Sequence, residues 1–215
     1  MSRRVLPLLV AAALRAGPLA AQLPAFVGSA ELGLSRQHFA ANFQGGSESL
    51  SGALMYGQAG VALRPVSIAV TYAQGRLASS SASATARSVV EASVMISRRV
   101  TPWLLLKAGP HVRSYSATGS TERWVMWELH AHGDEPMITG VLWAYLEGWA
   151  AVSASSNVDP GGSGARGAEA GVTLQIPGSP LRLRLAYAVD QASLKNDVRS
   201  EALQAIQVSL GLGGR

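Results

Sequence analysis

Apolar and polar residues alternate along most of this chain, and the alternating segments are each about ten residues long. The clearest example runs from Leu181 to Asp190, where Leu, Tyr and Val side chains alternate with Arg182, Arg184, two alanines and the aspartate. A β-strand places successive side chains on opposite faces, whereas a helix would distribute these arginines around its surface. The period of two therefore predicts strands that each have one apolar face.

The breaks between the alternating segments are of two kinds, and the two kinds take turns. Short breaks contain proline, which belongs at strand ends and in turns, and the others are mostly longer and rich in Ser, Gly, Asn and Asp. The short breaks are 64–65, 99–102, 132–136 and 177–180, and the others are 42–49, 77–86, 117–121, 153–166 and 192–200. This order predicts about ten strands (8–12), near 28–41, 50–63, 66–76, 87–98, 103–115, 122–131, 137–152, 167–176, 181–191 and 201–212. A buried helix is an alternative for 137–152, because both faces of that segment are apolar.

The N-terminus has the pattern of a secretory signal peptide. Arg3 and Arg4 precede a short apolar run, Val5 to Leu14, and the small residues Ala20 and Ala21 follow. The apolar run is too short to span a bilayer as a helix. We therefore expect residues 1–21 to be a signal peptide and residues 22–215 to form one domain.

The composition excludes several classes of protein. The chain has no cysteine, so an exported form has neither disulfides nor a thiolate metal site. Removal of the leader lowers Lys plus Arg from 18 to 15, against 13 acidic residues, and no basic cluster remains for nucleic acid. Charged residues make up 14% of the chain and hydrophobic ones 48%, whereas a soluble domain carries about 25% charged residues. Because no long apolar stretch follows the leader, the apolar residues must be dispersed on strand faces.

Strands with one apolar face can cross a bilayer only if the sheet closes, because an unpaired backbone group in hydrocarbon is costly. The opposite face would then line a narrow interior. We expect its charges to pair with one another into a network that plugs the lumen. An anion-selective constriction formed by Lys107, Arg113, Arg182 and Arg184 is the alternative. The predicted network consists of Glu91, Lys107, Arg113, Glu128, Glu147, Glu169, Arg182 and Arg184, with Glu31, His111, His130 and Asp190 on the same face.

With its leader, alternating strands and two kinds of connection, the chain resembles the small bacterial outer-membrane β-barrel proteins over residues 28–212. The resemblance implies an all-β fold, a single closed up-and-down antiparallel transmembrane β-barrel, in contact with outer-membrane lipid and with surface or periplasmic proteins through its loops. The loops 153–166 and 192–200 would make the outward contacts. Two features depart from the family: the chain does not end in an aromatic residue, and aromatic residues are only 6%. A soluble periplasmic barrel or sandwich that binds an apolar ligand therefore stays open. Aromatic girdles would have to draw on Trp103, Tyr115, Trp124, Trp127, Trp143, Tyr145 and Trp149.

Glu128, His130, His132 and Asp134 form the one local cluster with metal-ligand chemistry. On a strand the first three share a face, and two imidazoles with a carboxylate suit a divalent metal such as Zn²⁺. We favour the simpler interpretation, a strand that ends in a polar turn, and expect neither a metal nor another cofactor.

A catalytic site at the outer rim is a further hypothesis, because some outer-membrane barrels are lipid hydrolases. His38 lies at a predicted outer strand end, with Ser35 and Glu31 nearby. No serine stands two residues after His38, and no Gly-x-Ser-x-Gly or His-Glu-x-x-His motif is present. We therefore expect a non-catalytic outer-membrane protein with a structural, adhesive or narrow-passage role, and keep a small pore or transporter and a lipid hydrolase as alternatives.

Overall fold

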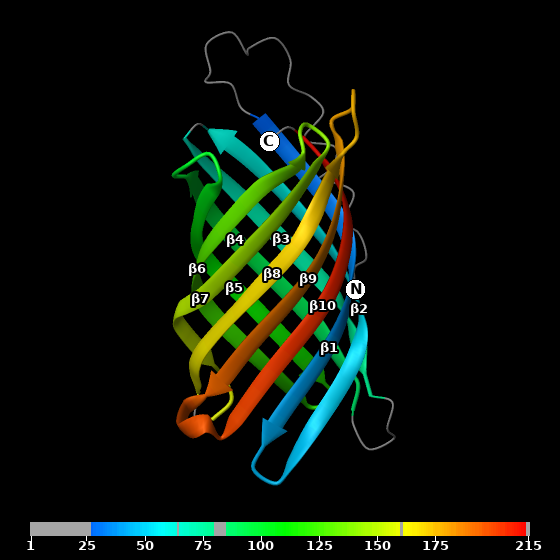
Figure 1. Ribbon diagram of the computed structural model, residues 1–215. Coiled ribbons are helices and arrows are strands. Elements are labelled where there is room, and N and C mark those ends of the chain that lie inside the picture. The colour runs from blue at the N-terminus through cyan, green and yellow to red at the C-terminus, as the bar shows by residue number, and fades with distance from the viewer. Residues whose placement is uncertain (1–26, 64, 80–84, 160, 214–215) are drawn as a thin grey trace, which may run out of the picture.

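The computed structural model describes residues 27–63, 65–79, 85–159 and 161–213 and shows ten antiparallel strands that close into one barrel (Figure 1). The predicted fold class and strand count are confirmed. No helix among these residues is long and apolar enough to span a membrane. The strands are β1 (Val27–Phe43), β2 (Gly46–Leu63), β3 (Val66–Ala78), β4 (Arg87–Arg99), β5 (Leu104–Ala117), β6 (Ser120–Ile138), β7 (Leu142–Ser156), β8 (Gly162–Gln175), β9 (Leu181–Leu194) and β10 (Arg199–Leu212), and a 3₁₀ turn, η2 (Lys195–Asp197), precedes β10.

Each strand pairs with its neighbours in sequence, and β1 also pairs with β10, from Ala30 opposite Leu212 to Phe43 opposite Arg199. The barrel therefore has no open edge. We name its two ends by their connections. The terminal end carries the two ends of the described chain and the β2–β3, β4–β5, β6–β7 and β8–β9 turns, and the distal end carries the other five connections, among them the β1–β2 hairpin at the bottom of Figure 1.

The distal connections are shorter than the sequence predicts. The predicted break at 42–49 is a tight turn at residues 44–45, and Gly45 there adopts a φ of +96°. The predicted loops 153–166 and 192–200 shrink to residues 157–161 and 195–198, because β7, β8, β9 and β10 continue through their Ser- and Gly-rich ends. Strand pairing thus extends beyond the apolar part of the wall, where outward-facing serines replace aliphatic residues.

Between β6 and β7 one expected turn is wrong, whereas the strand expected over 137–152 is confirmed from Leu142 onward. The predicted turn at 132–136 is strand, and the chain reverses at residues 139–141 instead. Pro136 still pairs with Trp143, next to an irregularity in the register, which is where a sheet tolerates a residue without an N–H. The helix considered for 137–152 is not formed, because most of that segment is β7.

The wall sorts its residues by polarity. Every Asp and Glu in the described strands except Glu135 faces the lumen. Large apolar side chains face outward, for example Leu32 with 71% and Leu34 with 61% of their surface exposed. A water-soluble monomer rarely exposes apolar surface continuously around its circumference, whereas a bilayer requires it.

Glycines inside the barrel stand directly opposite its largest inward side chains. Gly167 pairs with Trp149 across the β7–β8 ladder, and a Cβ at Gly167 would lie 2.3 Å from the Trp149 Nε1. Gly171 stands in the same way opposite Tyr145. The same pairing of glycine with a bulky partner occurs at Gly33 with Tyr56 and at Gly211 with Arg182. At these four positions glycine leaves the space that a narrow lumen needs for its long side chains.

Candidate functional site

The lumen brings together all eight residues of the predicted charge network. Arg113 on β5 is its most buried cation, with 9% of its side chain exposed. Its Nε donates to Glu91 on β4 at 2.9 Å, and its Nη2 donates to Asp190 on β9 at 2.7 Å. Trp149 donates its indole N–H to the same aspartate at 3.1 Å. Because β5 and β9 are not neighbours, Arg113 ties two separate parts of the wall together across the lumen.

A second part of the network, here called the histidine–glutamate chain, runs along β5, β6 and β7. Glu128 accepts from His111 at 2.8 Å and contacts His130 at 3.0 Å. Glu147 contacts His130 at 2.7 Å and accepts from Lys107 at 2.6 Å. The chain ends at His132, whose Nδ1 lies 2.8 Å from Glu147. Both carboxylates are thus fully engaged by protein groups.

The proposed metal ligands do not converge on one point. Glu128 and His130 are in contact, but His132 binds Glu147 instead. Asp134 lies farther along β6 and forms an ion pair with Arg99 at 3.2 Å. Among the described residues, no group of three or more His, Asp or Glu side chains could hold a metal ion.

Glu31 is the centre of a third part of the network, where β1, β9 and β10 meet. It accepts a hydrogen bond from Ser209 at 2.7 Å and lies 3.3 Å from Arg184 and 3.6 Å from Arg182. Arg184 also contacts Glu169 at 3.5 Å. Each of the four cations considered for an anion-selective constriction therefore lies within ion-pair distance of at least one carboxylate.

An apolar layer crosses the lumen on the distal side of these charges. Trp124, Phe39, Leu50 and Leu77 are at most 1% exposed, so none of them borders an open water channel. The layer takes side chains from every strand except β7, and the β7 residue Trp149 packs against it. Its buried members are Phe39, Ala41, Leu50, Leu54, Ala73, Leu77, Val89, Tyr115, Trp124, Met126, Ala165, Leu194 and Leu203.

A cluster of ion pairs covers the apolar layer at the distal end. Arg87 pairs with Glu48 and with Glu122, and Arg199 pairs with Glu122 at 3.0 Å and with Glu201 at 2.8 Å. The order along β6 is Glu122, then Trp124 and Met126, then Glu128, and β4 shows the same order with Arg87, Val89 and Glu91. From the distal end inward, the lumen is thus ionic, apolar and again ionic.

A cavity of about 380 Å³ lies in the lumen on the terminal side of the apolar layer. It extends from Leu54 in that layer to Ser97 near the β4–β5 turn, and the charge network forms much of its wall. Ser35 and Gln37 line it with buried side chains, and neither the Ser35 Oγ nor the Gln37 Oε1 has a hydrogen-bond partner among the described residues. A cavity of this size lined by polar side chains has room for several water molecules.

The structure corrects two expectations about individual side chains. Most of the residues suggested for aromatic girdles lie inside, because Tyr115, Trp124 and Tyr145 are at most 6% exposed and Trp149 and Trp143 share the inward face of β7. Only Trp103 and Trp127 face outward, with 56% and 55% exposure.

The rim histidine is also arranged differently from the sequence-based hypothesis. His38 faces outward, whereas Ser35 and Glu31 face the lumen, so the three cannot act together. The Nδ1 of His38 lies 3.0 Å from the Oγ of Ser51 on β2, a contact that the sequence spacing did not indicate. No carboxylate among the described residues forms an ion pair or hydrogen bond with His38, so the ring lacks the orienting group of a hydrolase triad.

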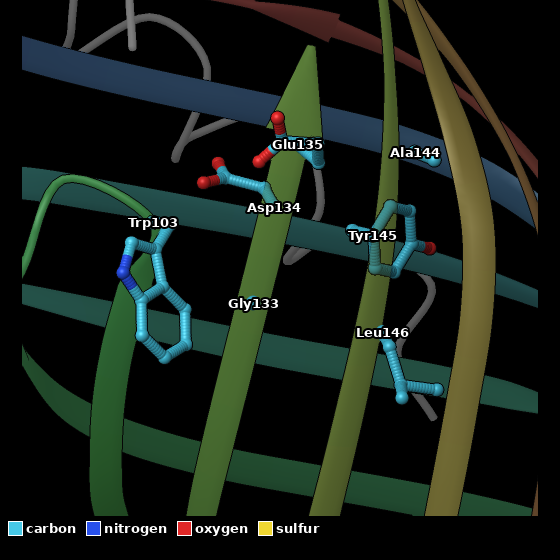
Figure 2. Close-up of a pocket in the computed structure, with 7 residues that line it drawn as sticks. All are labelled: Trp103, Gly133, Asp134, Glu135, Ala144, Tyr145 and Leu146. Carbon is cyan, nitrogen blue, oxygen red and sulfur yellow. The ribbon is translucent and has the colours of Figure 1, made fainter. Parts of the chain in front are cut away.

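An open groove lies on the outer wall near the terminal end. Gly133 leaves space there between the rings of Trp103 and the side chain of Leu146, and Glu135 stands at one end (Figure 2). The Trp103 carbonyl accepts the backbone N–H of Asp134 at 3.0 Å, which fixes the position of the indole beside β6. An exposed tryptophan at the edge of an apolar wall suits the boundary between lipid and water.

Comparison with known proteins yields structural similarity only. No family model matches the chain, and no curated protein matches it. Among solved structures, the β domain of the Bordetella autotransporter BrkA matches 87% of this chain and 99% of its own, with 12% identity and a TM-score of 0.48. An outer membrane channel from Pseudomonas putida F1 matches 93% of this chain and 100% of its own, with 12% identity and a TM-score of 0.45. The translocator domain of the autotransporter NalP from Neisseria meningitidis matches 86% of this chain and 88% of its own, with 14% identity and a TM-score of 0.44. At these scores the similarities carry no information on what this lumen does.

Proposed function

We propose that this protein is an integral outer-membrane β-barrel whose lumen is closed to diffusion and whose role is structural or adhesive rather than catalytic. Support for the membrane location comes from the wall, which has no open edge and presents aliphatic side chains outward on every strand. Support for closure comes from the apolar layer, the single observation that carries the proposal. A lumen lined by Phe39, Leu50 and Trp124 at no more than 1% exposure has no continuous water path.

Planar-bilayer recording tests closure directly. We expect the refolded mature protein to give no stable conductance steps, because ions would have to cross a desolvated apolar layer. A Phe39→Ala/Trp124→Ala variant removes two of the largest side chains of the layer and should produce steps. Trp103→Ala, which removes an outward-facing indole, serves as the matched control and should remain silent. Stable steps in the wild type would refute closure.

A membrane barrel and a soluble periplasmic barrel differ in simpler assays. We expect the protein to stay with membranes during carbonate extraction and to migrate faster on detergent gels before boiling than after. Release by carbonate would favour the soluble alternative. The same gel assay verifies that each variant named here has folded before its properties are compared.

Lipid hydrolysis is the one catalytic alternative that a specific contact favours, because His38 and Ser51 are within hydrogen-bond distance on the outer wall. Without an orienting carboxylate on the imidazole, we expect no release of fatty acid from phospholipid vesicles. Hydrolysis by the wild type that disappears in Ser51→Ala but persists in Ser49→Ala would overturn the non-catalytic proposal.

A further inference from the structure

Cations on the two faces of the wall differ in their partners. Each inward-facing Lys or Arg of the described strands forms an ion pair. The outward-facing arginines form none with any described residue, and of their side chains only that of Arg166 makes a hydrogen bond, to Gln191. The outward-facing arginines of the strands are Arg36, Arg76, Arg98, Arg123 and Arg166.

Arg36 and Arg76 are neighbours on this outer wall. Ala53 on β2 pairs with Arg36 on β1 and with Arg76 on β3, so the three side chains form one row across adjacent strands. Strands lie about 4.8 Å apart, which places the Cα atoms of the two arginines roughly 10 Å from each other. The methyl group of Ala53 is small enough to leave a shallow gap between the two guanidinium groups.

This row marks the border of the apolar wall. The next outward-facing row toward the terminal end contains Leu34 and Met55, which are 61% and 59% exposed, and it continues on β3 with Gln74. The next row toward the distal end contains the hydrogen-bonded pair His38 and Ser51. A bilayer that covers the aliphatic rows would therefore place its headgroups at Arg36.

The chemistry of the row favours a phosphate group. Two unpaired guanidinium groups present planar sets of N–H donors, which match phosphate oxygens with bidentate geometry. The only outward-facing acid in the described strands is Glu135, which lies at the opposite end of the barrel. The potential over the row is therefore positive, and the aliphatic rows beside it suit acyl chains.

We propose that Arg36 and Arg76 bind the phosphate of a phosphorylated lipid headgroup in the leaflet at the distal end, while its acyl chains lie along Leu34 and Met55. The proposal rests on the membrane location proposed above. A lipid is a better occupant than free phosphate, because the site continues directly into the apolar wall. The His38–Ser51 pair can add hydrogen bonds to the polar part of the same headgroup.

Titration of the full mature barrel in maltoside micelles, with native mass spectrometry as the readout, tests the proposal. The probes are dioleoyl phosphatidic acid, a glycerolipid without phosphate and inorganic phosphate. We expect the wild type to bind phosphatidic acid in preference to the other two. Arg36→Gln/Arg76→Gln should weaken that binding by about tenfold or more, the effect of losing at least one charge-assisted hydrogen bond.

Arg98→Gln/Arg123→Gln is the matched control, because it removes the same charge from two outward arginines that do not share a row. Its affinity for phosphatidic acid should remain within about twofold of the wild type, since it leaves the proposed site intact. The proposed site would be wrong if both double variants lost the same affinity for phosphatidic acid, or if Arg36→Gln/Arg76→Gln left that affinity unchanged. It would also be wrong if inorganic phosphate bound as tightly as phosphatidic acid. Release by carbonate would count against the membrane location instead, so the two failures are distinguishable.

Discussion

Replacement of Arg113 by Met should be among the most damaging substitutions in the lumen. It removes both hydrogen bonds that tie Glu91 and Asp190 to β5, at 2.9 and 2.7 Å, and leaves two carboxylates near each other without their shared cation. Breaking a buried pair by removing one partner costs about 3–5 kcal/mol, because the remaining charge is uncompensated. We expect a loss of this size in the free energy of unfolding, measured by urea titration of protein folded into short-chain phosphatidylcholine vesicles, with tryptophan fluorescence as the signal.

Two controls isolate the electrostatic origin of that loss. Arg98→Met removes an outward-facing arginine without a partner and should change stability by no more than about 0.5 kcal/mol. Arg113→Met combined with Glu91→Gln and Asp190→Asn removes all three charges and should recover most of the stability, since no buried charge is then unpaired. A cost below about 1 kcal/mol for the single substitution, or no recovery in the triple variant, would show that Arg113 is not the tie that the geometry indicates.

The remaining predictions concern packing, the lipid-facing wall and metals. Gly167→Leu should destabilise the barrel by about 1–3 kcal/mol, because its Cβ would lie 2.3 Å from the Trp149 Nε1. Gly148→Leu is the control and should be neutral, because its Cβ would meet nothing within 4 Å. Equal urea midpoints for the two variants would contradict this prediction. Leu32→Lys lies two outward rows from the border at Arg36 and should cost about 2–4 kcal/mol in vesicles, whereas Gln207→Lys, whose side chain faces the lumen, should cost less; equal costs for the two would contradict this. Protein purified without chelators should contain no stoichiometric metal, and one bound zinc per chain by elemental analysis would show that the histidine–glutamate chain rearranges into a metal site.

The alternation of polar and apolar residues was sufficient to predict most of the fold. The alternation in β9 places Arg182, Arg184 and Asp190 on one face, and that face is the lumen. The lengths of the distal connections could not be predicted, because serine and glycine are as frequent in the paired strand ends above an apolar wall as they are in loops. Composition indicates where the wall stops being apolar, and says little about where hydrogen bonding between strands stops.

The apolar layer was missed, although the sequence contained a signal for it. Trp124 and Met126 are an even number of residues from Glu128 on the same strand, so their side chains face the lumen whenever that glutamate does. The expectation that aromatic residues form an outer girdle instead placed Trp124 on the lipid-facing side of the wall, which is wrong. The His38–Ser51 contact could not have been predicted, since it depends on the register between β1 and β2, which alternation does not determine.

The hydrogen bond between Glu31 and Ser209 joins positions 178 apart in the sequence. An intermediate that lacks β10 cannot contain it. Until β1 and β10 pair, both have backbone groups without a strand partner, and contacts of such long range slow folding. Deletion of the 14 residues of β10 would leave the first strand in that state permanently, so truncated chains should be targets for proteolysis rather than smaller barrels.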